Sequence, residues 1–149
     1  MVRKRLLALA SCLVVLAVPL ASCSKDQAPV RDARAEAAAS AAQRLQGRWV
    51  LVSFQPDVPL DTVMQLLLNE QINRFIVDFQ GQKLTAQGPG VTINRTFRVD
   101  EAYVDHFKAT IYDAYGVGVD SSCDFQGNTL LVNGLTSPWR GRASFRRAP

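Results

Sequence analysis

The chain has 149 residues, of which 48% are hydrophobic, and a formal net charge of +4. The charge is concentrated at the start: without Arg3, Lys4 and Arg5, 14 basic residues face 13 acidic ones, a net charge of +1. Composition therefore allows one compact domain with its own core and gives no indication of nucleic-acid binding.

An uncharged apolar segment, residues 6–22, follows these first cations. A transmembrane helix needs about 20 apolar residues. This segment is shorter, contains Pro19 and ends in small residues. The pattern is typical of a signal peptide on an exported protein, and we expect residues 1–22 to be cleaved.

The end of this segment resembles the lipobox of bacterial lipoproteins. The residues that carry the resemblance are Leu20, Ala21, Ser22 and Cys23. It implies that the Cys23 thiol is diacylated and that cleavage leaves this lipidated cysteine (palmitate is the usual label) as the new N-terminus. More than one acyl chain gives stable anchoring, because each buried methylene contributes about 0.8 kcal/mol. We expect a protein that is anchored to a bacterial membrane. Ser24 after the cysteine favours sorting to the outer membrane. Lys25 keeps the inner membrane as an alternative destination.

Cysteine usage argues against a disulfide framework. Cys12 leaves with the signal peptide and Cys23 carries lipid, so Cys123 is left as the free thiol. Cys123 alternates with Ser121 and Phe125 along an expected strand. This position favours a small buried side chain over a reactive nucleophile.

Residues 23–46 precede the expected domain. The part around Pro29 is polar and predicts a flexible tether. Residues 31–46 are rich in alanine, the strongest helix former, but contain few large apolar side chains. We expect a marginal helix or semi-ordered spacer here, and a single compact domain over residues 47–149.

Residues 59–73 have helical periodicity, in contrast to the strand-like residues 48–54 before them. Pro59 and Asp61 suit the first turn of a helix. We expect its apolar stripe to pack against a sheet or barrel. The stripe consists of Leu60, Val63, Met64, Leu67, Leu68 and Ile72.

The remaining chain alternates between apolar and polar residues, as strands of an antiparallel sheet do. The sequence D-F-Q-G-x-x-L occurs at residues 78–84 and 124–130 and predicts the same glycine hairpin twice. Closing such a meander removes its unpaired edges. The expected fold is therefore mainly β: an antiparallel up-and-down barrel of 7–8 strands, with one helix after the first strand.

Gly47 and Trp49 form a G-x-W sequence that resembles the start of lipocalin-like, calycin-type domains. The resemblance implies that the tryptophan plugs the closed end of a barrel and that an arginine of the last strand stacks on it. Arg142 or Arg146 would supply this arginine. The domain is shorter than a typical lipocalin and lacks the family's T-D-Y motif, which implies a reduced or absent cavity.

A barrel of eight strands has room for packed side chains or for one small ligand. Apolar inward residues would favour an apolar or amphiphilic ligand, with Arg95 facing a carboxylate or phosphate headgroup. The candidate lining residues are Phe75, Val77, Phe79, Ile93, Arg95, Phe97, Phe107 and Ile111. The alternative is that they fill a solid core, and that the protein is a lipid-tethered partner of another envelope protein. Trp139 and Tyr112 or Tyr115 would then form the contact surface.

The titratable residues predict no catalytic or metal site. His106 is the one histidine, and the adjacent Asp105 points to the opposite face of a strand. One histidine and one free cysteine are too few ligands for zinc. We expect no enzyme activity, cofactor or metal. The expected partners are membrane lipid through Cys23 and either an apolar small molecule or an envelope protein.

Overall fold

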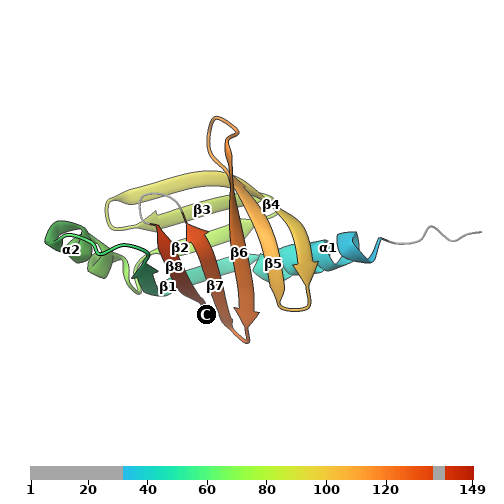
Figure 1. Cartoon of the computed structure of the whole chain (residues 1–149), viewed down its shortest axis with the longest axis horizontal. Helices are drawn as coiled ribbons and strands as arrows, with labels where there is room; N and C mark the ends of the chain where they lie inside the picture. Colours follow the sequence, from blue (N-terminus) through green and yellow to red (C-terminus); the bar gives the residue numbers. More distant parts are fainter. Residues whose placement is uncertain (1–31, 136–139) are drawn as a thin grey trace, which may run out of the picture. The chain divides into compact units, whose positions relative to one another are not determined.

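The computed structural model describes residues 32–135 and 140–149 (Figure 1). The expected signal peptide, the lipobox with Cys23, and Trp139 lie outside the described residues. The described chain forms a closed antiparallel barrel in which each strand pairs with its neighbours in sequence and the last strand pairs with the first. This confirms the predicted mainly-β meander.

The elements are α1 (Ala33–Leu45), β1 (Gly47–Pro56), α2 (Thr62–Gln71), β2 (Ile76–Gln80), β3 (Lys83–Gly88), β4 (Val91–Tyr103), β5 (His106–Tyr112), β6 (Gly118–Gln126), β7 (Thr129–Leu135) and β8 (Gly141–Arg147). The described strands number eight, within the expected range, and α2 is the expected helix after the first strand. A further helix, α1, precedes the barrel.

Helix α1 packs on the barrel, contrary to the expected marginal spacer. Its N-cap is Asp32, whose side chain accepts a hydrogen bond from the backbone N–H of Arg34. Ala41 and Leu45 are buried in the core, and the helix contacts β4. Small alanine side chains allow close approach, and Leu45 is the one large apolar residue that α1 buries in the core. It belongs to the same compact unit as the strands.

The two D-F-Q-G-x-x-L segments form equivalent hairpins at one end of the barrel, as predicted. Two-residue turns connect β2 to β3 and β6 to β7. Gly81 and Gly127 are the first turn residues, and each has φ of 60°. A positive φ at this position is the pattern of a type II′ turn, which glycine adopts without steric cost.

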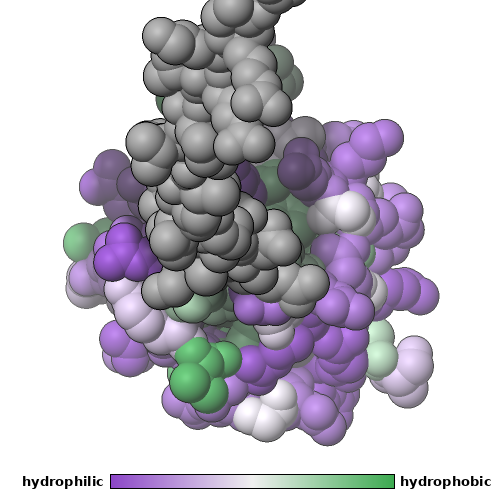
Figure 2. Space-filling view, turned by 90° about the vertical axis from the view of Figure 1, so that its right-hand side faces the viewer, coloured by the Kyte–Doolittle hydropathy of each residue, from purple (hydrophilic) through white to green (hydrophobic). Residues whose placement is uncertain are grey.

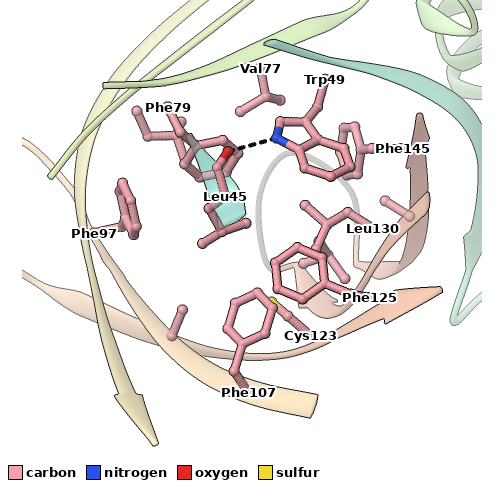
Figure 3. Close-up of a cluster of buried hydrophobic side chains, with 14 of the residues drawn as sticks. Leu45, Trp49, Val77, Phe79, Phe97, Phe107, Cys123, Phe125, Leu130 and Phe145 are labelled. Atoms are coloured by element: carbon pink, nitrogen blue, oxygen red, sulfur yellow. Dashed lines mark hydrogen bonds between the residues drawn. The ribbon is translucent and has the colours of Figure 1, made fainter. Parts of the chain in front are cut away.

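The same end of the barrel is filled by a hydrophobic core (Figure 3). The ring centroids of Trp49 and Phe125 lie 6.3 Å apart, and those of Phe125 and Phe107 lie 4.9 Å apart. The Trp49 indole N–H donates a 2.7 Å hydrogen bond to the carbonyl of Leu45, the last residue of α1. The buried indole is thereby satisfied, and α1 is fixed to the start of β1.

Candidate functional site

The closed end of the barrel is completed by an arginine of the last strand. The guanidinium carbon of Arg147 lies 4.6 Å from the centroid of the Trp49 ring. Its Nη1 donates a 2.9 Å hydrogen bond to the carbonyl of Gln46, and its Nη2 donates to the carbonyl of Arg44. Arg147 therefore joins β8 to the end of α1 and covers the indole.

The expectation that Arg142 or Arg146 would stack on the tryptophan was wrong. Side chains alternate along β8, and Phe145 is one of its buried, inward residues. Arg147 is next in this inward series, whereas Arg142 and Arg146 are exposed on the outer face. Arg142 instead donates a 2.6 Å hydrogen bond from Nε to the side-chain oxygen of Asn133.

The other half of the barrel contains a cavity of about 470 Å³. Small-molecule sites in proteins have volumes of about 300–1,000 Å³. The cavity extends to the β3–β4 turn and the β5–β6 loop, at the opposite end of the barrel from Trp49. The solid core, which was the alternative to a ligand cavity, is therefore present in one half of the barrel only.

Most of the predicted lining residues surround this cavity. These are Phe75, Val77, Phe79, Ile93, Arg95 and Ile111. Phe97 and Phe107 do not line it, contrary to prediction, and both are instead packed in the hydrophobic core. The Phe97 ring meets Phe79 edge-on at 5.0 Å, and Phe107 packs against Phe125.

The sequence analysis missed the contributions of β1, β3, β6, β7 and β8 to the lining. Residues from these strands include Leu51, Phe54, Leu84, Ala86, Val132, Ala143 and Phe145. The lining residues of β3, β7 and β8 could have been found from the sequence, because inward and outward residues alternate strictly along these strands. On β1 this alternation fails, because the register with β8 shifts between Leu51 and Ser53 and turns Phe54 inward.

Two charged residues lie in the cavity wall. Arg95 is half-buried, and its Nη1 donates a 2.9 Å hydrogen bond to the carbonyl of Asn94. Asp113 accepts hydrogen bonds at Oδ1 from the backbone N–H groups of Tyr115 and Val117, at 2.8 and 2.9 Å. Asp113 thus shapes the β5–β6 loop, while the remaining guanidinium N–H groups of Arg95 have no hydrogen-bond partner within residues 32–135 and 140–149.

A buried hydroxyl lies in the same wall. Ser121 is 3% exposed and belongs to the inward face of β6. Its Oγ has no hydrogen-bond partner within the described part of the chain. An unpaired buried polar group costs about 1–3 kcal/mol. The unpaired hydroxyl therefore calls for a hydrogen-bond partner from inside the cavity.

Helix α2 lies beside the cavity end of the barrel and projects away from it (Figure 1). Asp61 caps the helix by accepting a 2.8 Å hydrogen bond from the backbone N–H of Met64. The buried residues of the helix are Leu68 and Gln71, and the Gln71 side chain donates a 3.0 Å hydrogen bond to the carbonyl of Pro89. These contacts attach α2 to the β3–β4 turn.

The prediction that the apolar stripe of α2 packs on the barrel was wrong for part of the stripe, although Ile72 at its end does pack against the core. Val63 is 64% exposed and Leu66, just outside the stripe, is 61% exposed. Leu67 is also exposed, and Leu68 is the stripe residue that is buried.

The face shown in Figure 2, viewed from the side opposite α2, is mostly hydrophilic where it is coloured.

Cys123 is a free and buried thiol, as predicted. Burial raises its pKa to about 12, and the nearby negative charge of Asp124 adds to this shift. The thiol is therefore protonated at neutral pH, which argues against a nucleophilic role.

His106 has a carboxylate partner that the sequence analysis did not identify. Its Nδ1 lies 2.8 Å from Oδ1 of Asp124, which is its register partner on β6. Asp105 instead forms a 2.9 Å ion pair with Arg44 of α1. Within the described ranges, no three metal-ligating residues form a cluster, and no helix has the length and apolar character needed to cross a membrane.

Comparison with protein families, with curated proteins and with solved structures finds no match to this chain.

Proposed function

We propose that this protein binds a small apolar or amphiphilic molecule inside its barrel and has no catalytic role. The observation that carries the proposal is the cavity of about 470 Å³, whose wall is mainly aliphatic and aromatic. The closed barrel and the G-x-W sequence support a lipocalin-like domain. Arg95 supports an anionic headgroup on the ligand, because its guanidinium lies in the wall and is only partly engaged.

We further propose that the domain is held on a bacterial membrane, with the outer membrane favoured. The support is the sequence before the described residues: a cationic start, an apolar segment and the lipobox that ends at Cys23. The acyl chains on this cysteine would be the membrane anchor. A carrier in this position would hold its ligand close to a lipid surface.

A second candidate function is that of an envelope interaction protein. The observation that favours it is the exposed apolar surface of α2, which includes Val63 and Leu66. Tyr115, in the β5–β6 loop, is 93% exposed and is a further candidate contact. Tyr112 is half-buried, with Arg98 lying 5.9 Å from its ring, and is a weaker candidate.

Filling the cavity tests the carrier function. Ile111→Trp places a large side chain in the lining, whereas Lys108→Trp places it on the outer face of the same strand, β5. Displacement of an apolar fluorescent probe and native mass spectrometry of co-purified lipid are the measurements. We expect Ile111→Trp to abolish binding and Lys108→Trp to retain it. A wild-type protein that binds no probe and carries no lipid would refute the carrier function and favour the interaction function.

A further inference from the structure

The hydroxyl of Ser121 is placed where a ligand in the barrel would touch it. Ser121 lines the cavity, is almost completely buried, and has an Oγ without a hydrogen-bond partner within the described residues. Its register partner on β5 is Ala109, and the next inward residue of β6 toward the loop is Val119. Neither neighbouring side chain can accept or donate a hydrogen bond, so the protein itself leaves the hydroxyl unpaired.

The backbone next to Ser121 leaves room for a ligand atom. Gly134 on β7 also lines the cavity and lies at a register shift between Asn133 and Leu135. Its φ is 84°, and an added Cβ would lie 3.4 Å from the carbonyl oxygen of Asp120 and 3.9 Å from the Cα of Ser121. Glycine thus keeps the space beside the serine free of a side chain.

Ser121 and Arg95 give the cavity two different polar points. A serine hydroxyl can donate one hydrogen bond and also accept, so it matches an alcohol or a carbonyl oxygen. Arg95 is a fixed cation that matches a carboxylate or phosphate. An anionic amphiphile with an unsubstituted hydrocarbon tail would satisfy the arginine through its headgroup but would bury the Ser121 hydroxyl without a partner.

We propose that the ligand is an oxygenated amphiphile, with an anionic headgroup at Arg95 and a hydroxyl or oxo group on its apolar part that bonds to Ser121. This inference rests on the proposed carrier function and deepens it. The cavity then selects among chains of one length by the presence of an internal oxygen. Selection of this kind arises because the analogue without the oxygen leaves a buried polar group unpaired.

The test compares matched ligands on the full chain. The protein is held in phosphatidylcholine nanodiscs, with empty nanodiscs as the blank, and carries 1-anilinonaphthalene-8-sulfonate as the reporter. The competitors are decanoate, its ω-hydroxy analogue and its mid-chain hydroxy and oxo analogues, together with the same set built on dodecanoate. Ser121→Ala removes the hydroxyl, and Ser122→Ala is the control, because Ser122 lies on the opposite face of β6.

We expect at least one oxygenated analogue to bind about two- to tenfold more tightly than its parent carboxylate, the range that one added hydrogen bond gives. This preference should disappear in Ser121→Ala and persist in Ser122→Ala. Equal binding of every analogue and its parent by the wild-type protein would overturn the inference while the carrier function stands. A preference that survives in Ser121→Ala would also overturn it. Absence of reporter binding would overturn both.

Discussion

Arg147 covers the indole ring of Trp49, so that a side chain of the last strand holds a side chain of the first one. The contact is reinforced by hydrogen bonds from the guanidinium to the carbonyls of Gln46 and Arg44. The first strand, the last strand and the end of α1 therefore meet at the guanidinium group of Arg147. The closed end depends on this side chain more than on any other exposed arginine of β8.

Replacing Arg147 by Ala is expected to lower the free energy of unfolding by about 1–2 kcal/mol. The change removes a partly exposed cation–π contact and hydrogen bonds to two carbonyls. Urea unfolding followed by tryptophan fluorescence is the measurement. Arg146→Ala, on the outer face of the same strand, should change stability by less than about 0.5 kcal/mol. Equal losses in the two variants would contradict the assignment.

The two leucines on α2 should respond very differently to truncation. Leu68 is 2% exposed, so Leu68→Ala is expected to cost about 2–4 kcal/mol of stability through lost packing. Leu66→Ala should be nearly neutral, because this side chain is already in water. Chemical denaturation of both variants measures the difference. A large loss in Leu66→Ala would mean that the outer face of α2 is covered in solution.

The Cys123 thiol should be inert in the folded protein. Its pKa of about 12 leaves almost no thiolate at pH 7–8, and its burial blocks access. We expect iodoacetamide to label the Cys123 peptide only after unfolding, as read by peptide mass spectrometry. Rapid labelling of the native protein would contradict the burial.

The same shift predicts a loss of stability in alkaline solution. The thiol ionises more readily in the unfolded chain, near the ordinary pKa of 9.0, than in the folded one, near 12. Its contribution to stability is therefore complete below about pH 9 and decreases as the pH rises toward about 12. Cys123→Ala should lose less stability than the wild-type protein over this pH range, measured by denaturation at each pH. Identical pH profiles would show that the thiol does not contribute.

Arg95 should decide the preference for an anionic headgroup. Arg95→Gln is expected to weaken binding of decanoate about tenfold and to leave the matching alcohol, decanol, unchanged, because only the carboxylate makes a charge-assisted hydrogen bond. Competition against a neutral apolar probe measures both ligands. Arg98→Gln is the control, since Arg98 faces outward on β4 and contacts Asp100. Equal weakening of the alcohol would indicate a general loss of the cavity.

Lipidation is tested at Cys23. Cys23→Ala should accumulate as an unprocessed precursor that incorporates no labelled palmitate, because the thiol that receives the first acyl chains is missing. Cys123→Ala should be labelled like the wild-type chain. Continued incorporation in Cys23→Ala would refute the proposed anchor.

Much of the barrel was predictable because strand periodicity and turn chemistry are local. Arg95 was placed on the inward face of its strand by simple alternation with Ile93 and Phe97. The paired hairpins at Gly81 and Gly127 were predictable because only glycine adopts this turn conformation at low cost.

The remaining features depend on contacts between distant segments, which a single sequence does not encode in a readable way. Arg147 and not Arg146 meets Trp49 because of the register between β1 and β8, and the pairing of His106 with Asp124 follows from the register of β5 and β6. Ser121 could be recognised as inward, but its unpaired hydroxyl follows from which residues surround it in three dimensions.

The closure of β8 on β1 also determines when the barrel can form. Arg147 and its acceptor Arg44 are separated by 103 residues, so this contact closes a loop that spans nearly all of the described fold. Contacts of such long range form slowly, since the entropy of loop closure precedes their stabilisation. Until β8 has been synthesised and has paired, β1 and β7 each expose an unpaired edge to other chains. Loss of this one strand would therefore turn a fold without edges into an open sheet that is prone to aggregate.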